Sequence, residues 1–483
     1  MPLAKYVFKP GINKEGTNYS NEGGWFDADK VRFRKGKPER IGGWSKFTND
    51  SFIGTCRKLY PYKATNGDSF VILGTHQKLY NLSGDVYYDI NPIRSTTSAG
   101  DVTFSASDGS STITITDASH GAVNGDFVTF SGASSLGGNI TATVLNQEYQ
   151  IDTVTGTNTY TITAKDTSGD TVTANSSDSG NGGSSVVGVY QINSGLDVYV
   201  RGTGWGLNTW GAGGWGSSGD LSLTNQLRLW SIDNFGDDTI AAPRAGAIYF
   251  WDKSDGLTTR AVALSSESGA SDVPTACLQV MTSDVDKHVI AFGSNPIGSS
   301  TIDPLLVRFS DRESAVDWTP TATNQAGGVQ LSQGSTIVGA LRTRQEILIW
   351  TDAGIVSMRF VGEPFIFSFT EVAEGPSLIS PNAAVNANGR VYFMDRDGFH
   401  VYSGTSQRLP CTVLDYVLSD LNQDQAYKVF AASNSSVNEV MWFYPSGTNT
   451  EIDKYVLFNY LENTWSIGTT NDGFTRTAWN AAH

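Results

Sequence analysis

Apolar and polar residues alternate along this chain in short runs, and tight corners separate the runs. In residues 389–404, two alternating runs flank the corner Asp397-Gly398. An Asp-Gly corner between alternating runs is a strong local signal for a β-hairpin. We predict similar units at residues 347–358, 247–256 and 70–82.

The spacing of these units predicts the fold class. Hairpins that recur every roughly 40 to 50 residues are typical of a β-propeller with one blade per unit. We therefore expect an all-β propeller of about six blades. The 52 glycines and the many Trp, Tyr and Phe residues suit strands joined by tight turns. Helical spacing of apolar residues is clearest at 413–421.

Composition divides the chain into four predicted parts. One part is dominated by Thr, Ser and Gly and has alternating runs such as Thr112–Thr116, so we predict a small β-sandwich-like domain inserted into the propeller. The predicted parts are an N-terminal entry segment at 1–47, a first blade at 48–94, the inserted domain at 95–187 and the remaining blades at 188–483.

The net charge of −15 and the pI of about 4.7 limit the classes of partner. A protein that grips nucleic acid usually has the opposite balance. An acidic chain can still surround DNA that has to slide, because like charges prevent tight contact. The other interpretation is that acidity only keeps the protein in solution.

A basic run in the entry segment contrasts with this acidity. One interpretation is a contact surface for an acidic partner, and the other is an ordinary exposed strand and turn. The run consists of Lys30, Arg32, Arg34, Lys35, Lys37 and Arg40. Arg32, Arg34, Lys35 and Lys37 are our candidate interaction residues within it.

Three tryptophans stand five residues apart in the glycine-rich stretch 204–216. Glycines favour a loop here, and the large aromatic side chains would anchor it. Trp205, Trp210 and Trp215 therefore either dock on a neighbouring subunit or partner, or fold back over the chain's own blades.

Sequence motifs for catalysis, metals and cofactors are weak. The five histidines lack metal-ligand spacing, and Asp395–Gly398 lacks the later acidic ligand of a calcium loop, so we expect no metal and no cofactor. Ser310–Trp318 partly resembles the Asp-box turn of sialidase-like propellers, which is a structural turn. We predict that the chain is not an enzyme.

The sequence has three scattered cysteines, and we find no signal peptide and no membrane-spanning segment in it. These features predict assembly in the host cytoplasm.

Several segments, taken in order, resemble the nozzle, or packaged-DNA stabilisation, proteins of short-tailed bacteriophages. The resemblance covers most of the chain outside the predicted inserted domain. It is carried by Pro38–Trp44, Leu229–Asp238, Arg308–Arg312 with Asp317-Trp318, Val391–Gly398 and Asn459–Ser466.

This resemblance implies a structural protein of the virion tail. The family's members form a hexameric ring that docks on a dodecameric adaptor below the portal. Genome DNA passes through the lumen, tail fibres or a needle attach to the ring, and the ring helps retain packaged DNA until ejection. The competing prediction is a carbohydrate-binding or carbohydrate-cleaving propeller, in which tryptophans stack on sugar rings.

Overall fold

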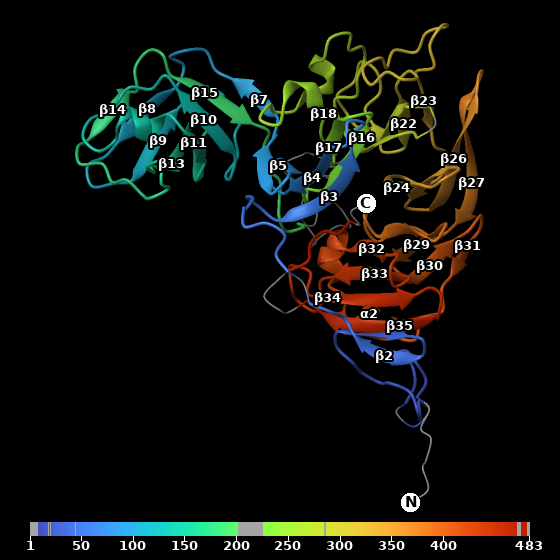
Figure 1. Ribbon diagram of the computed structural model, residues 1–483. Helices are drawn as coiled ribbons and strands as arrows, with labels where there is room; N and C mark the ends of the chain where they lie inside the picture. The colour runs from blue at the N-terminus through green and yellow to red at the C-terminus, as the bar shows by residue number, and fades with distance from the viewer. Residues whose placement is uncertain are drawn as a thin grey trace, which may run out of the picture.

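The computed structural model describes residues 8–17, 19, 21–43, 45–200, 226–284, 286–470 and 475–480. Its regular structure is almost entirely antiparallel β-sheet (Figure 1). Six four-stranded sheets form a propeller, and two further sheets form an inserted sandwich beside it. This confirms the predicted all-β fold class.

Each blade is a meander of four strands that are consecutive in sequence and paired with their neighbours. The blades, in chain order, are β3 Cys56–Lys63, β4 Ser69–Thr75, β5 Leu79–Ser83 and β6 Val86–Asp89; β16 Trp230–Phe235, β17 Asp238–Pro243, β18 Tyr249–Trp251 and β19 Val262–Ala263; β20 Cys277–Thr282, β21 Val289–Ser294, β22 Leu306–Phe309 and β23 Gly327–Gln330; β24 Ile337–Arg342, β25 Ile347–Thr351, β26 Gly354–Gly362 and β27 Ile366–Glu374; β28 Ala384–Ala387, β29 Arg390–Asp395, β30 Gly398–Tyr402 and β31 Ser406–Arg408; and β32 Phe430–Asn434, β33 Glu439–Tyr444, β34 Lys454–Asn459 and β35 Thr464–Thr469.

Local sequence explains most of these strands. The predicted Asp-Gly corner joins β29 to β30, where Asp395 pairs with Gly398. Helix α2, Leu414–Asp420, lies in the segment with helical spacing. The predicted hairpin at 247–256 is wrong in its second half. There the Asp252 side chain accepts a hydrogen bond from Ser254 N, 2.7 Å, and begins a 3-10 turn, η1, Lys253–Asp255, in place of a strand.

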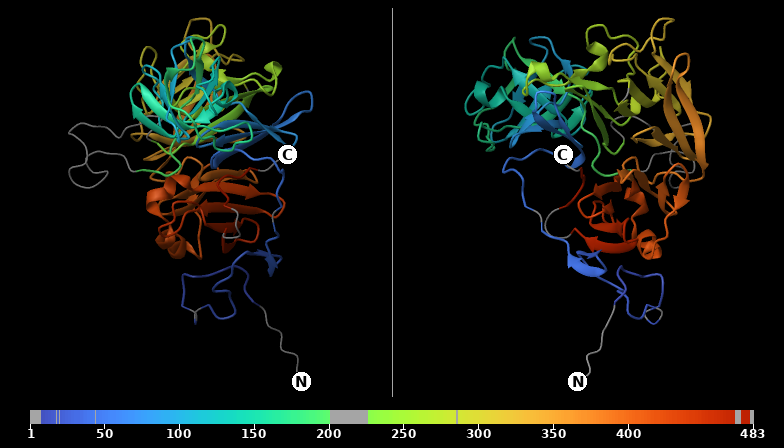
Figure 2. Two further views of the ribbon diagram at one scale, coloured as in Figure 1. Left: turned by 90° about the vertical axis from the view of Figure 1, so that its left-hand side faces the viewer. Right: turned by 45° about the vertical axis from the view of Figure 1, so that its right-hand side comes forward.

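Neighbouring blades are held together by shared apolar clusters. In one such cluster, Ile72 of the first blade packs with Trp230 and Trp251 of the second. In another, Trp350 of the fourth blade packs with Phe393 of the fifth. The first strand of each blade faces the propeller axis, and the blades follow one another around it (Figure 2).

The first and last blades meet at a seam without a shared strand. The C-terminal segment 475–480 bridges them, because Ala478 packs on the first blade and Trp479 on the last. Thr477 Oγ1 and Asn480 Nδ2 donate hydrogen bonds to the backbone carbonyls of Cys56 and Leu59. The ring is therefore closed by side chains and a terminal segment, whereas pairing within each blade is by backbone.

The inserted domain is a two-sheet sandwich with its own core. Its sheets pack on buried aromatic and β-branched residues such as Phe104, Ile115, Phe130 and Tyr160. The strands and the short helix are β7 Ile93–Thr96, β8 Thr103–Ala106, β9 Thr112–Thr116, β10 Phe127–Ser131, α1 Ala142–Leu145, β11 Glu148–Gln150, β12 Thr153–Gly156, β13 Thr159–Thr163, β14 Asp178–Asn181 and β15 Val187–Gln191. The sandwich strands thus run from Ile93 to Gln191, compared with the span 95–187 expected from composition.

A buried polar cluster fixes the sandwich against the first two blades. Lys78, almost fully buried, lies 2.7 Å from Asp89 and 2.5 Å from Glu148 of the sandwich. Arg260 of the second blade contacts the same two carboxylates, at 2.9 and 3.3 Å. Because both cations pair with a carboxylate of the first blade and a carboxylate of the sandwich, this cluster links the two units through charged hydrogen bonds.

The N-terminal segment covers the outer edge of the last blade. It contains the hairpin β1 Val31–Arg34 and β2 Lys37–Arg40, whose turn uses the left-handed residues Lys35 and Gly36. Phe33 is buried in the core of the last blades. Thr469 on strand β35 donates two hydrogen bonds to the Asp29 carboxylate, 2.7 and 3.0 Å. Within the described part of the chain, no helix has the length and apolar character needed to cross a membrane.

Candidate functional site

A narrow cavity of about 230 Å³ lies on the propeller axis. The first strands of all six blades line it, and bulky side chains such as Trp230, Trp350 and Phe430 reduce its width. The C-terminal residues Ala478 and Trp479 also line it. A DNA duplex, whose major groove alone is ~12 Å wide, does not fit such a space. The axis of a single propeller can hold a small ligand but cannot conduct DNA.

At one end of the cavity, Arg57 joins the seam between the first and last blades. Its guanidinium lies 2.6 Å from Asp197 and 2.6 Å from Glu451, and Lys428 lies 3.2 Å from Glu451. Burial lowers the pKa of Arg57, but Glu451 and Asp197 outweigh this effect and raise it. Burial raises the pKa of Glu451, yet the Arg57 hydrogen bond and charge bring it below its usual value. This mouth is a closed ion-pair network.

Tyr60, Asp233 and Arg342 meet from three different blades, just beyond the residues that line the cavity: Tyr60 follows Leu59, and Arg342 follows Leu341. Tyr60 Oη donates a hydrogen bond to Asp233 Oδ1, 2.6 Å, and Arg342 Nη1 lies 3.0 Å from Asp233 Oδ2. Arg342 Nε also contacts Asp284, 3.1 Å, whose side chain is 64% exposed. We call Tyr60, Asp233, Asp284 and Arg342 the Tyr-Asp-Arg cluster.

The electrostatics of this cluster favour a charged, hydrogen-bonding surface. Burial, followed by the neighbouring Asp233 charge, raises the pKa of Tyr60, so the phenol stays protonated at neutral pH. Burial lowers the pKa of Arg342, but Asp233 and Asp284 raise it overall. A phenol, a guanidinium and carboxylates side by side can bind hydroxyl-rich or anionic ligands. Sequence reasoning missed this cluster, because Tyr60, Asp233 and Arg342 are each more than a hundred residues apart.

Together with Arg57 and Arg244, Lys58 is one of three cations that line the cavity. Its ammonium donates a hydrogen bond to Asn382 Oδ1, 3.2 Å. Burial lowers the pKa of Lys58, and Asp233 partly opposes that effect. A lysine of this kind gives the cavity wall a hydrogen-bond donor whose charge depends on what lies beside it.

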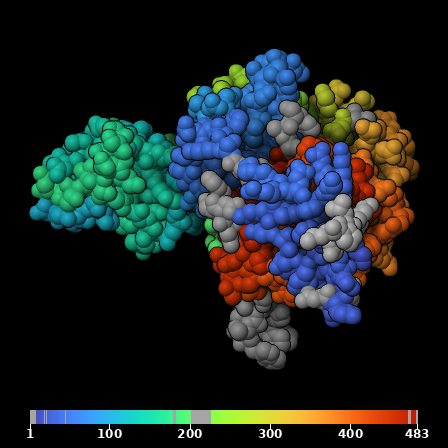
Figure 3. All heavy atoms as spheres, turned by 60° about the horizontal axis from the view of Figure 1, so that its bottom comes forward, coloured from blue at the N-terminus to red at the C-terminus, as the bar shows by residue number. Residues whose placement is uncertain are grey.

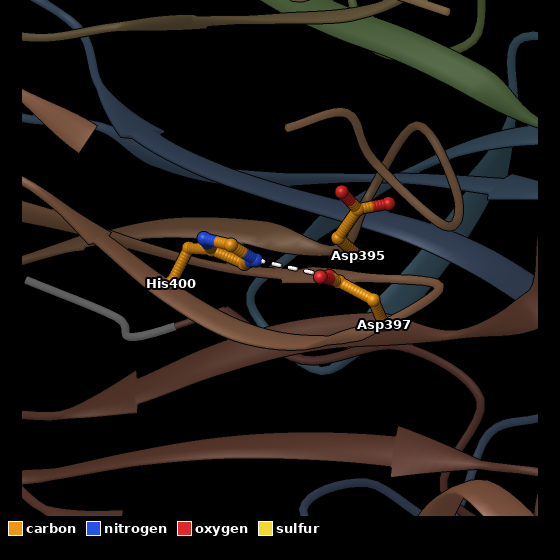
Figure 4. A group of neighbouring side chains, drawn as sticks. All are labelled: Asp395, Asp397 and His400. Carbon is orange, nitrogen blue, oxygen red and sulfur yellow. Dashed lines mark hydrogen bonds and ion pairs between the residues drawn. The ribbon is translucent and has the colours of Figure 1, made fainter. Parts of the chain in front are cut away.

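Asp395, Asp397 and His400 come together at the β29–β30 hairpin (Figure 4). Their ligand atoms lie within 4.8 Å of one another. However, Asp395 accepts hydrogen bonds from the backbone nitrogens of Ser377, 2.9 Å, and Arg396, 2.6 Å. His400 Nε2 lies 3.1 Å from Asp397 Oδ1. These contacts stabilise the turn, so we interpret the group as structural, as the sequence predicted for this corner.

The candidate residues of the basic run have different environments. Arg32 is mostly buried and lies 2.9 Å from Glu439, whose side chain is fully buried in the last blade. Arg34, Lys35 and Lys37 are exposed at the surface, and Arg34 lies 4.0 Å from Glu39. The N-terminal segment spreads over this face of the molecule (Figure 3). Arg32 therefore has a structural role, whereas the other three remain available to a partner.

Burial has the largest effect on the pKa of Glu439 in the Arg32–Glu439 pair. It raises the pKa of Glu439 to about 7, even though the Arg32 charge acts in the opposite direction. Sequence reasoning did not predict this pair, because Arg32 and Glu439 lie near opposite ends of the chain.

The three tryptophans at Trp205, Trp210 and Trp215 lie outside the described residues. The Asp-box-like segment is a folded turn: Asp311 N donates to Asp317 O, 2.7 Å, and the buried Trp318 donates from Nε1 to Ala315 O, 2.8 Å. This agrees with the structural role expected for it.

Comparison with known proteins gives fold-level likeness alone. No family model and no curated protein matches the chain. Among solved structures, a phage phi92 endosialidase is similar at 11% identity with a TM-score of 0.23, covering 92% of this chain and 62% of that one. An ancestral GH74 enzyme follows at 10% identity and 0.31, covering 86% and 59%. AztD from Citrobacter koseri is similar at 8% identity and 0.29, covering 87% and 96%. The chain spans about three fifths of the length of the first two.

One prediction is corrected at this point. We predicted from sequence that the chain is not an enzyme, yet two of these similar structures are enzymes. A motif search along the sequence also could not find the Tyr-Asp-Arg cluster, because its residues come together only in the folded chain. The prediction is therefore withdrawn, and catalysis belongs among the functions to be tested.

Proposed function

We propose that this chain is a subunit of the tail nozzle of a short-tailed bacteriophage. In this proposal, six copies form a ring below a dodecameric adaptor, genome DNA passes through the lumen, and tail fibres or a needle attach to the ring. The virion tail is then its location.

One observation carries the proposal: the hairpin that leads into the family-like segment Pro38–Trp44 contacts a second family-like segment, Asn459–Ser466, although the two are far apart in sequence. The corner of the β1–β2 hairpin, next to Pro38–Arg40, donates backbone hydrogen bonds from Lys35 and Gly36 to the Glu462 carboxylate. Glu462 belongs to the segment Asn459–Ser466. This contact supports a shared structural role for the two segments, each of which is weak evidence for the family on its own.

The proposal places the DNA path between copies of the chain. The axial cavity of one propeller is too small for a duplex, so a lumen has to be formed by several propellers side by side. The net charge of −15 suits such a lumen, because a wall that bound phosphates would slow ejection.

The test uses heads that carry the adaptor but lack this protein. We expect added chain to form a sixfold ring with an axial channel on the portal vertex, visible by electron microscopy. Chain that stays unattached as single propellers would contradict the proposal. An unrelated acidic protein of similar net charge is the control for non-specific adsorption.

A second candidate function is carbohydrate binding or cleavage at the Tyr-Asp-Arg cluster. The supporting observation is the cluster itself, because a phenol, a guanidinium and two carboxylates can form hydrogen bonds with the hydroxyl groups of a sugar. The endosialidase among the similar structures suggests polysialic acid as the first compound to test.

This second candidate is tested with the purified chain alone. We would measure polysialic acid binding by calorimetry and its hydrolysis by release of reducing ends. Tyr60→Phe should weaken both, whereas Tyr62→Phe is a matched control, because Tyr62 donates instead to Asp237 O and accepts from Thr239 Oγ1. No binding by the wild-type chain would eliminate this candidate.

A further inference from the structure

The hairpin of β26 and β27 extends further than the other blade hairpins and ends in an exposed apolar tip. Both strands have nine residues. At the tip, residues 361–365, the Phe365 side chain is 77% exposed and Val361 is 53% exposed. Glu363 is exposed between them and accepts a hydrogen bond from Gln325 Nε2, 3.3 Å. A protruding pair of apolar side chains around one carboxylate is typical of an interface element.

A pocket of about 340 Å³ elsewhere on the chain has the complementary chemistry. Its floor consists of Met441, Phe443 and Tyr455, all buried in the last blade. Its rim carries the basic residues Lys30, Arg40 and Arg476. We call this the basic pocket. It offers an apolar floor to an aromatic side chain and positive charge to a carboxylate.

Charge favours another copy of this chain as the occupant. Residues 30–40 contain six basic side chains and one acidic one, net +5, so the remaining chain carries −20. A basic region on an otherwise acidic molecule attracts the acidic surface of its own copies. The tip residue Glu363 lies within that acidic remainder.

We propose that the tip at residues 361–365 inserts into the basic pocket of a neighbouring copy. Phe365 packs on the apolar floor, and Glu363 pairs with Arg40. The tip and the pocket lie on different sides of the propeller, with β26–β27 at the right-hand edge and β2 below the last blade (Figure 1). Such a contact is head-to-tail, and repeated contacts of this type generate closed rings when the rotation closes. The inference rests on the proposed ring and names the contact that builds it.

The test uses the full chain and compares single variants with a charge exchange. Phe365→Asp and Glu363→Arg should each reduce ring formation on adaptor-bearing heads about thirtyfold, as expected for a central interface residue. Arg40→Glu should have a similar effect. The double variant Glu363→Arg with Arg40→Glu should restore rings, because it reverses the pair. Leu461→Asp is the control, since Leu461 is also exposed, 62%, but belongs to neither surface.

A second measurement addresses proximity directly. Cysteines introduced at Phe365 and at Gly42, which lines the pocket, should form a disulfide between copies under mild oxidation. A ladder of covalent oligomers supports the contact. If the wild-type chain forms rings and the single variants form them equally well, the tip-and-pocket contact is wrong while the nozzle remains. If the wild-type chain forms no ring on heads, both proposals fail.

Discussion

The buried carboxylate of Glu439 should make the stability of this protein depend on pH in a defined direction. Burial raises its pKa from an ordinary value of 4.5 to about 7 in the folded chain. A carboxyl group whose pKa is higher in the folded state binds its proton more tightly there. Its contribution to stability is therefore complete below pH 4.5 and is lost as the pH rises through about 7.

The size of this effect on the unfolding free energy follows from the difference between the two pKa values of Glu439. Moving the pKa from 4.5 to about 7 corresponds to about 3 kcal/mol of unfolding free energy. Glu439→Gln keeps the shape but removes the titration. We therefore expect the stability of the wild-type chain to fall by about 3 kcal/mol relative to this variant between pH 4.5 and pH 8.

The assay is urea unfolding of both proteins at several pH values in this window, followed by tryptophan fluorescence. Other groups titrate equally in both proteins, so the difference between the two curves isolates Glu439. Met441→Leu is the control, because it changes another buried side chain of strand β33 without removing a titratable group. Parallel curves for the wild type and Glu439→Gln would refute the reasoning.

Three further predictions concern the seam, the blade interface and the sandwich. Arg57→Met should lower the unfolding free energy by about 1.5 to 3 kcal/mol, because it removes the guanidinium from Asp197 and leaves Glu451 with Lys428 alone; calorimetry at neutral pH checks this. Gly74→Ala should cost about 1 to 3 kcal/mol, since a Cβ there would lie 2.4 Å from the Trp230 ring, and unchanged urea stability would contradict it. Lys78→Met should increase amide exchange at the sandwich–propeller boundary, measured by mass spectrometry, because it removes the buried cation between the two units.

Much of the fold was predictable because its signals are local. The corner at Asp397-Gly398 and the helical spacing before Leu421 each depend on a few adjacent residues, and the structure has the hairpin and the helix there. The failure at 247–256 is also local. The side-chain cap of Asp252 outcompeted strand formation, and a period-2 pattern contains no information about such a cap.

The candidate sites were much less predictable, for a physical reason. Tyr60 and Arg342 both reach Asp233 only because the blades close into a ring. Arg32 reads as one more exposed charge in a basic run, yet the N-terminal segment folds against the last blade and buries it beside Glu439. Contacts between residues this far apart in sequence are set by tertiary packing, and a short sequence window contains no information about it.

The sandwich enters and leaves the propeller at neighbouring points, since Ile93 and Gln191 pair on adjacent strands. A unit whose two ends already touch can be exchanged for another without altering the spacing of the blades around it. Because none of the six blades borrows a strand from it, the propeller keeps every sheet complete in its absence. A chain of this architecture can therefore acquire a different module at this point by one insertion event, while its six blades are inherited unchanged.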